Sequence, residues 1–239
     1  MPTQNYEPMP LRTQDTAIQG VLWDMDGTLL DTEPYWMAAE AALVAEFGGH
    51  WSEEEAMALV GNALPDAAAV LQRAGVALDA RRIIDRLLTE VLAGVRRHVA
   101  WRPGALELLE QLHAAKIPCG LVTMSEEPLA ALVLEALPRD YFAFRVTGEM
   151  VSRGKPHPEP YLLGLQKLRA HVQHLDPRRV IALEDSAPGI ASAAASGINA
   201  VLVPHIAPVP HSDAWHRVSS LEDLDLASLG ALVSTGDRR

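Results

Sequence analysis

Two aspartates separated by one residue end an apolar run near the start of the chain, in the segment Val21 to Thr28. Side chains alternate along an extended segment, so Asp24 and Asp26 should project to the same side. Gly27 permits the sharp exit that a β-carbon would hinder. The pattern predicts a buried strand that delivers two carboxylates to its carboxyl end, where α/β sheets hold their functional groups. One carboxylate could attack an electrophile while its neighbour moves a proton.

A D-x-D-G sequence alone is also common in turns, because Asp and Gly favour turn conformations. Three later segments favour the chemical interpretation. They are Leu121 to Thr123, Gly154 to Pro156 and Leu183 to Ser186. Their hydroxyl, ammonium and carboxylate groups are of the kinds that bind phosphate or a hard metal ion.

The remainder of the chain predicts the elements that position these groups. We expect strands at 17–23, 118–123, 143–147, 180–184 and 200–203, and helices at 105–115, 129–137, 159–170 and 187–196. Strands that alternate with helices form right-handed βαβ units, hence one parallel sheet covered on both faces. The carboxyl ends of these strands share one edge of the sheet. The side chains expected at that edge are Asp24, Asp26, Thr123, Glu184 and Asp185, with Lys155 in a proline-flanked turn before a helix.

Residues 34–98 show a different pattern, because apolar residues such as Trp36, Leu43 and Phe47 recur there at helical spacing. We expect about four helices and no strand in this segment. The predicted fold class is therefore α/β, a doubly wound parallel sheet of Rossmann-like type with an inserted α-helical cap domain. The predicted core domain comprises 17–33 plus 99–239, the cap domain is 34–98, and residues 1–16 are expected to be a disordered tail.

Composition excludes several classes of partner. The net charge of −11 argues against nucleic acid or an acidic membrane surface, since both require a basic face. The single cysteine, Cys119, lies in an apolar run and should be a buried, inert thiol. Neither a signal peptide nor an apolar stretch long enough for a membrane span is evident. We expect a cytoplasmic, monomeric enzyme that acts on a small molecule.

The four motifs, taken in order, carry a family resemblance. D-M-D-G-T at Asp24 to Thr28, L-V-T at Leu121 to Thr123, G-K-P at Gly154 to Pro156 and L-E-D-S at Leu183 to Ser186 resemble the haloacid-dehalogenase (HAD) superfamily of phosphohydrolases. The helical insertion after the first motif resembles the subgroup with an α-helical cap. That subgroup contains β-phosphoglucomutase and many sugar-phosphate phosphatases. The resemblance covers roughly residues 17–203.

The resemblance implies roles for the matching residues. Asp24 would attack phosphorus to give an aspartyl-phosphate. Asp26 would protonate the leaving alkoxide and then activate water. Thr123 would hold a phosphoryl oxygen through its hydroxyl, with nearby backbone N–H groups such as that of Met124 assisting. Lys155 would offset the negative charge of the phosphate and of Asp24.

The same resemblance implies a metal. A carboxylate approaches a phosphate readily only with a cation between them. Asp24, Asp185 and the backbone carbonyl of Asp26 would supply hard oxygen ligands, a set that suits Mg²⁺. Glu184 could ligate the metal directly, bind it through water, or orient the ligands from behind.

The predicted function is a Mg²⁺-dependent phosphomonoesterase that hydrolyses a small phosphorylated metabolite, a sugar or polyol phosphate, through an aspartyl-phosphate. Two alternatives stay open: a phosphosugar mutase of the β-phosphoglucomutase type, and a catalytically silent binding protein. A phosphonatase is disfavoured because it needs a cap lysine and residues 34–98 contain none.

The cap should select the substrate. Trp36, Asn62 and Asp66 are candidates for substrate contact by position. Aligned with the mutases, Trp36 falls where they carry a histidine, and Leu64 falls where they carry a phosphate-binding arginine. An apolar side chain cannot replace a guanidinium contact, so water should capture the phosphoryl group. Arg96 or Arg97 could compensate from another helix.

Overall fold

A six-stranded parallel sheet forms the centre of the protein, in a computed structural model that describes residues 18–235. The predicted tail at 1–16 lies outside the described residues. The strands lie in the order β3-β2-β1-β4-β5-β6. Their bounds are β1 Gly20–Trp23, β2 Cys119–Val122, β3 Phe142–Val146, β4 Val180–Glu184, β5 Asn199–Leu202 and β6 His216–Arg217. The chain runs outward from β1 to β3 and returns to β4 on the other side of β1, which confirms the predicted doubly wound topology.

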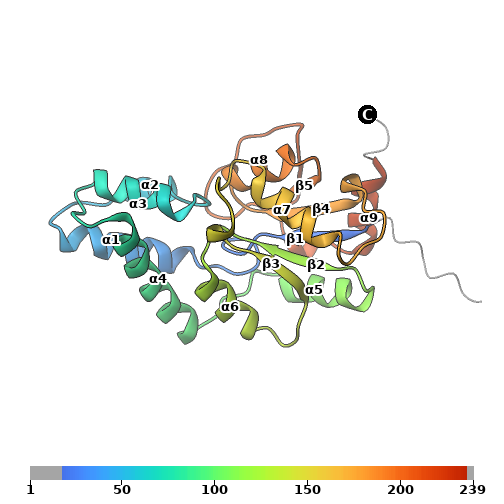
Figure 1. Ribbon diagram of the computed structural model, residues 1–239, viewed down its shortest axis with the longest axis horizontal. Coiled ribbons are helices and arrows are strands. Elements are labelled where there is room, and N and C mark those ends of the chain that lie inside the picture. Colours follow the sequence, from blue (N-terminus) through green and yellow to red (C-terminus); the bar gives the residue numbers. More distant parts are fainter. Residues whose placement is uncertain (1–17, 236–239) are drawn as a thin grey trace, which may run out of the picture.

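Helices cover both faces of this sheet (Figure 1). In β1, Val21 and Trp23 pack in one hydrophobic cluster and Leu22 in the other, as the alternation of a strand requires. The first cluster includes side chains of α5 (Ala105–Ala114), α6 (Glu127–Glu135) and α9 (Leu226–Thr235). The second includes side chains of α7 (Glu159–Leu168) and α8 (Ala187–Ala195). A sheet buried on both faces explains why its strands appear as uninterrupted apolar runs.

The register of the central strands fixes where the polar residues lie. Trp23, the last residue of β1, is paired with Leu121 on β2 and Leu183 on β4. The next residue, Asp24, donates its backbone N–H to the Leu183 carbonyl at 3.0 Å. Thr123 donates its own to the Val146 carbonyl on β3, also at 3.0 Å. The carboxyl ends of the central strands therefore meet at one edge.

Four helices separate β1 from the rest of the sheet, as predicted, and no strand of the described chain lies among them. They are α1 (Glu33–Glu46), α2 (Glu53–Met57), α3 (Leu64–Arg73) and α4 (Ala80–Arg97), hereafter the helical insertion. Ser52 and Glu55 form a reciprocal capping box at the start of α2, and Asp79 caps α4. The division into a core of 17–33 plus 99–239 and a cap of 34–98 stays a prediction.

The helical insertion lies over the carboxyl edge of the sheet (Figure 1). On one side, the Arg81 guanidinium of α4 binds both oxygens of Glu126, the residue before α6, at 2.6 and 3.0 Å. On the other side, the loop before α3 approaches the start of α8. Gly61 has φ +76°, and a β-carbon there would lie 2.3 Å from the Ser186 hydroxyl oxygen. A glycine therefore permits both the turn and the close contact with the residue after Asp185.

The chain beyond residue 203 adds elements that the sequence did not predict, namely β6, a short 3-10 helix at Leu221–Asp223, and α9. None of the helices within residues 18–235 combines the length and the apolar character needed to cross a bilayer.

Candidate active site

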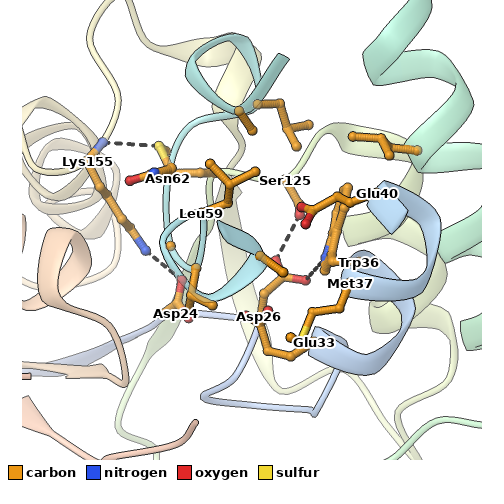
Figure 2. Close-up of a pocket in the computed structure, with 17 residues that line it drawn as sticks. Asp24, Asp26, Glu33, Trp36, Met37, Glu40, Leu59, Asn62, Ser125 and Lys155 are labelled. Carbon is orange, nitrogen blue, oxygen red and sulfur yellow. Dashed lines mark hydrogen bonds and ion pairs between the residues drawn. The ribbon is translucent and has the colours of Figure 1, made fainter. Parts of the chain in front are cut away.

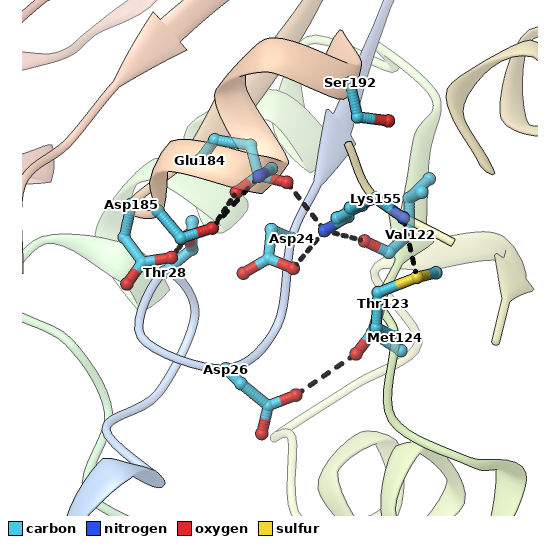
Figure 3. Close-up of polar contacts among 12 residues, drawn as sticks. Asp24, Asp26, Thr28, Val122, Thr123, Met124, Lys155, Glu184, Asp185 and Ser192 are labelled. Atoms are coloured by element: carbon cyan, nitrogen blue, oxygen red, sulfur yellow. Dashed lines mark hydrogen bonds and ion pairs between the residues drawn. The ribbon is translucent and has the colours of Figure 1, made fainter. Parts of the chain in front are cut away.

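A buried lysine joins two carboxylates at the centre of the site. Lys155 Nζ lies 2.5 Å from Asp24 Oδ1 and 2.6 Å from Glu184 Oε1, and it donates to the Val122 carbonyl at 3.0 Å (Figure 3). Lys155 is 3% exposed and Asp24 is 5% exposed. The predicted pairing of Lys155 with Asp24 is thus present, although the two residues are far apart in the sequence.

Burial and neighbouring charges together raise the pKa of both Asp24 and Lys155. Burial, followed by the negative charge of Glu184, raises the pKa of Asp24 to about 7. Burial by itself would lower the pKa of Lys155, but the carboxylates of Asp24 and Glu184 outweigh it and raise that pKa above its ordinary value. Lys155 therefore stays cationic, and Asp24 needs further positive charge to be fully ionised at neutral pH.

Asp185 completes a buried acidic cluster with Asp24 and Glu184, whose potential ligand oxygens all lie within 4.8 Å of one another. Asp185 Oδ1 accepts a long hydrogen bond of 3.4 Å from the Thr28 hydroxyl. Its other oxygen is buried and has no hydrogen-bond partner in the described chain. A buried carboxylate oxygen without a donor is costly unless a cation binds it. The donor set consists of hard oxygens, which fits Mg²⁺.

Gly27 is needed for this arrangement. Its φ is +83°, and a β-carbon at this position would lie 2.1 Å from Asp185 Oδ2. The glycine thus lets the turn after β1 pass directly beside the carboxylate that ends β4. The sequence predicted the sharp exit, but the contact with Asp185 depends on the tertiary fold.

Glu184 is occupied by donors from the protein. The Tyr161 hydroxyl donates to Oε1 at 2.5 Å, on the same oxygen that contacts Lys155. The Ser186 hydroxyl donates to Oε2 at 3.5 Å. These contacts hold the Glu184 carboxylate in place beside Lys155. Direct ligation of a metal by Glu184 stays a prediction.

Asp26 accepts four side-chain hydrogen bonds. Thr32 and Trp36 donate to Oδ1 at 2.6 and 3.2 Å, while Thr123 and Ser125 donate to Oδ2 at 3.1 and 2.8 Å. Trp36 belongs to α1, so the helical insertion helps to orient this carboxylate. Thr123 and Trp36 were predicted to contact substrate, and here both bind Asp26. The sequence analysis missed Thr32 and Ser125.

Two other predicted substrate contacts lie beside the site. The Met124 sulfur accepts the backbone N–H of Lys155 at 3.2 Å, which ties the turn after β3 to the end of β2. The Asn62 side chain donates to the Ala58 carbonyl at 3.1 Å and faces the same cavity. Asp66 does not line this cavity and lies in a depression beside the turn that carries Lys155.

A cavity of about 60 Å³ lies between the sheet edge and the helical insertion (Figure 2). Its polar lining on the sheet side comes from the strand-end residues, and the helical insertion contributes apolar side chains together with Glu33, Glu40 and Asn62. Lys155 is the only basic residue among the described residues that line it. The lining residues are Asp24, Asp26, Glu33, Trp36, Met37, Glu40, Ala56, Leu59, Val60, Gly61, Asn62, Leu64, Ala67, Leu87, Met124, Ser125 and Lys155.

The model of the haloacid dehalogenase-like hydrolases matches residues 21–203. The chain belongs to this family. That span contains all four motifs and the helical insertion, so the family resemblance seen in the sequence is confirmed.

Known HAD proteins resemble this chain over most of its length. A probable pseudouridine-5'-phosphatase of Saccharomyces cerevisiae is 31% identical over 91% of this chain and 99% of its own. Hexitol phosphatase A of Escherichia coli is 31% identical over 77% of this chain and 82% of its own. The structure of a β-phosphoglucomutase from Clostridium difficile superimposes with a TM-score of 0.78 at 20% identity, over 93% of this chain and 100% of that one. The chain is a HAD-type phosphatase, as predicted.

Proposed function

We propose that the protein is a Mg²⁺-dependent phosphomonoesterase that hydrolyses a small phosphorylated metabolite, a sugar or polyol phosphate, through an aspartyl-phosphate. The observation that carries this proposal is the position of Asp24. Its carboxylate contacts a cation, Lys155, and belongs to the acidic cluster with Asp185, and a second carboxylate follows two residues later. The similarity to a hexitol phosphatase supports the substrate class. We also propose that it acts in the cytoplasm as a monomer, without nucleic acid or membrane as a partner.

The proposed mechanism has two half-reactions. In the first, an Asp24 carboxylate oxygen bonds to phosphorus while the bond from phosphorus to the ester oxygen breaks. Asp26 gives a proton to the departing alkoxide. In the second, Asp26 takes a proton from water, whose oxygen bonds to phosphorus as the bond to Asp24 breaks. Lys155 offsets the negative charge on Asp24 and on the phosphoryl oxygens throughout.

The donor set suggests how the protein would hold Mg²⁺. We propose that Asp24 and Asp185 bind it through their side chains and Asp26 through its backbone carbonyl. Glu184 would orient Lys155. When bound, Mg²⁺ supplies positive charge between the nucleophile and the phosphate. Thr123 and the backbone near Met124 would contact the phosphoryl oxygens once Asp26 turns toward the leaving group.

Binding of Mg²⁺ should be visible in the thermal stability. A concentration about a hundredfold above Kd stabilises the folded state by ~2.7 kcal/mol, or roughly 5 to 10 °C in Tm for a chain of this size. Asp185→Asn should lose this Mg²⁺-dependent rise. It should also have a higher metal-free Tm, because burial, followed by the negative charge of Asp24, holds the pKa of Asp185 well above its ordinary value and this carboxyl group therefore destabilises the folded state near neutral pH.

The control is Asp213→Asn, since Asp213 is exposed and lies outside the acidic cluster. It should respond to Mg²⁺ as the unaltered protein does. An equal rise in the Tm of Asp185→Asn would contradict the metal assignment. Ca²⁺ should suppress turnover, because it takes more ligands and can engage both oxygens of Asp24.

The mutase alternative rests on the shared fold with β-phosphoglucomutase. A mutase must hold a bisphosphate by its second phosphate. Leu64, which the sequence alignment places at the phosphate-binding arginine of the mutases, lines the cavity, and Trp36 binds Asp26. Arg96 and Arg97 are exposed at the end of α4 and do not line the cavity. These contacts favour transfer to water.

One assay distinguishes phosphatase activity from mutase activity. With β-glucose 1-phosphate and a trace of the bisphosphate, free phosphate should form faster than glucose 6-phosphate. A panel of sugar and polyol phosphates should also release phosphate in the presence of Mg²⁺. Faster formation of glucose 6-phosphate would favour the mutase, and the absence of turnover on every ester would favour a silent binding protein.

A further inference from the structure

One face of α1 contributes two acids to the lining of the cavity. Glu33, Trp36, Met37 and Glu40 follow each other at spacings of three, one and three residues, which places them along one stripe of a helix. Figure 2 shows them on the side of the cavity opposite Lys155. Glu33 and Glu40 are each only 5% exposed.

These two carboxyl groups have few partners. Glu40 accepts one hydrogen bond, from the indole N–H of Trp51 at 3.3 Å. No donor in the described chain reaches the Glu33 carboxyl group. Burial, followed by the charge of Asp26, raises the pKa of Glu33 to about 8, and burial raises that of Glu40 to about 7. Both groups line the cavity, so further donors for them can come from a molecule bound there.

A structural role explains only part of this arrangement. Glu33 lies in the first turn of α1, where a negative charge stabilises a helix. That role requires no burial against a cavity, and it does not apply to Glu40 in the middle of the helix. Neither residue takes part in the proposed mechanism.

Among the described residues that line the cavity, Lys155 is the only one with a positive charge. The other lining residues from the helical insertion are uncharged: Leu59, Leu64 and Leu87 are apolar, and the amide of Asn62 donates to the Ala58 carbonyl. Lys155 is already engaged by Asp24 and Glu184. A leaving group with a second phosphate or a carboxylate would therefore face two acids without a cation. A leaving group with hydroxyl groups would supply the donors that Glu33 and Glu40 lack.

We propose that Glu33 and Glu40 form a subsite that binds hydroxyl groups of the leaving group, and that it selects phosphate esters of uncharged polyhydroxyl compounds against esters with a second anionic group. This inference rests on the proposed function and names its substrate class. A site built to bind substrate hydroxyl groups discriminates strongly against analogues that lack them, because its own polar groups are then left unpaired.

The test compares three substrates that differ at the leaving group: a hexitol phosphate, the matching aldonate phosphate with one terminal carboxylate, and p-nitrophenyl phosphate, which has no hydroxyl group. The unaltered enzyme should have a kcat/KM for the hexitol phosphate at least about tenfold above that for the aldonate phosphate. Glu33→Leu should lower kcat/KM for the hexitol phosphate by about ten- to a hundredfold. Its kcat/KM for p-nitrophenyl phosphate should change by less than about threefold.

Control variants separate this selectivity from a folding defect. Glu33→Leu should keep or raise the Tm, because an unpartnered buried acid is removed, and Glu33→Gln should restore part of the hexitol phosphate activity through its amide oxygen. Glu54→Leu alters an exposed acid on α2 that does not line the cavity, and it should leave all three substrates unaffected.

Equal losses on the hexitol phosphate and on p-nitrophenyl phosphate would overturn the proposal in favour of a structural role. Equal use of the hexitol and aldonate phosphates by the unaltered enzyme would also overturn it. In both cases, Asp24-dependent phosphate release would leave the proposed function intact. If no ester is hydrolysed, the proposed function fails and the subsite fails with it.

Discussion

Asp24→Asn is expected to abolish phosphate release, with a loss of about four powers of ten or more, while the protein stays folded. An amide cannot form the acyl phosphate that the proposed mechanism requires. The substitution keeps the shape of the side chain, and Lys155 keeps its ion pair with Glu184 at 2.6 Å. The measurement is steady-state phosphate release on the best substrate of the panel, with Tm recorded for the same samples.

Asp66→Asn is the matched control for this result. Asp66 is an exposed acid of the helical insertion that does not line the cavity, so its kcat/KM should stay within about threefold of the unaltered enzyme. Near-normal phosphate release by a folded Asp24→Asn protein would rule out Asp24 as the nucleophile.

Lys155→Met is expected to damage both stability and turnover. The variant leaves the buried carboxylates of Asp24 and Glu184 facing each other without a cation. Removing one partner of a buried ion pair costs about 3–5 kcal/mol in the free energy of unfolding. Turnover should fall as well, because no ammonium group offsets the charge on Asp24 and the phosphate. Urea unfolding and phosphate release measure the two effects.

A second substitution separates the two contributions of Lys155. In Lys155→Met with Glu184→Gln, one of the opposed charges is gone, so much of the lost free energy of unfolding should return. Turnover should not return. Lys167→Met, on α7, should change neither quantity, because Lys167 does not contact these carboxylates. A stable, fully active Lys155→Met protein would contradict the role assigned to this lysine.

The position of the catalytic edge could be predicted because it depends on short-range patterns. Apolar runs that end at Asp24, Thr123 and Glu184 define three neighbouring strands, and parallel pairing then brings their ends together. The helices of the insertion follow from 3.6-residue periodicity and from caps such as Ser52. Each of these signals lies within a few residues of the element that it specifies.

The partners of Asp26 could not be predicted in the same way. Thr32 lies six residues away and Ser125 lies 99 residues away, and both reach it only because the chain turns after β1 and β2 ends beside β1. The hydrogen bond from Trp36 to Asp26 was not predicted, because it depends on the position of α1 over the site, which is a tertiary property. The sequence analysis did not single out Glu33, since its burial is visible only with the insertion in place.

The elements after residue 203 gave weak signals for physical reasons. β6 has two residues, His216 and Arg217, and both are exposed, so no apolar run marks it. The segment that forms α9 contains Gly230 in its middle, and glycine weakens the preference of a segment for a helix. Packing of Leu229 and Val233 in the core compensates for this weak preference.

The central claim, a covalent phosphoryl intermediate on Asp24, is tested most directly by trapping that intermediate. The enzyme is quenched in acid during turnover with Mg²⁺, reduced with borohydride, digested, and sequenced by mass spectrometry. Reduction of an aspartyl-phosphate converts the aspartate to homoserine, and we expect this conversion at Asp24 only in samples that contained substrate. Conversion at Asp26 or Asp185 instead, or intact aspartate at position 24 in samples quenched at full turnover, would contradict the proposed mechanism.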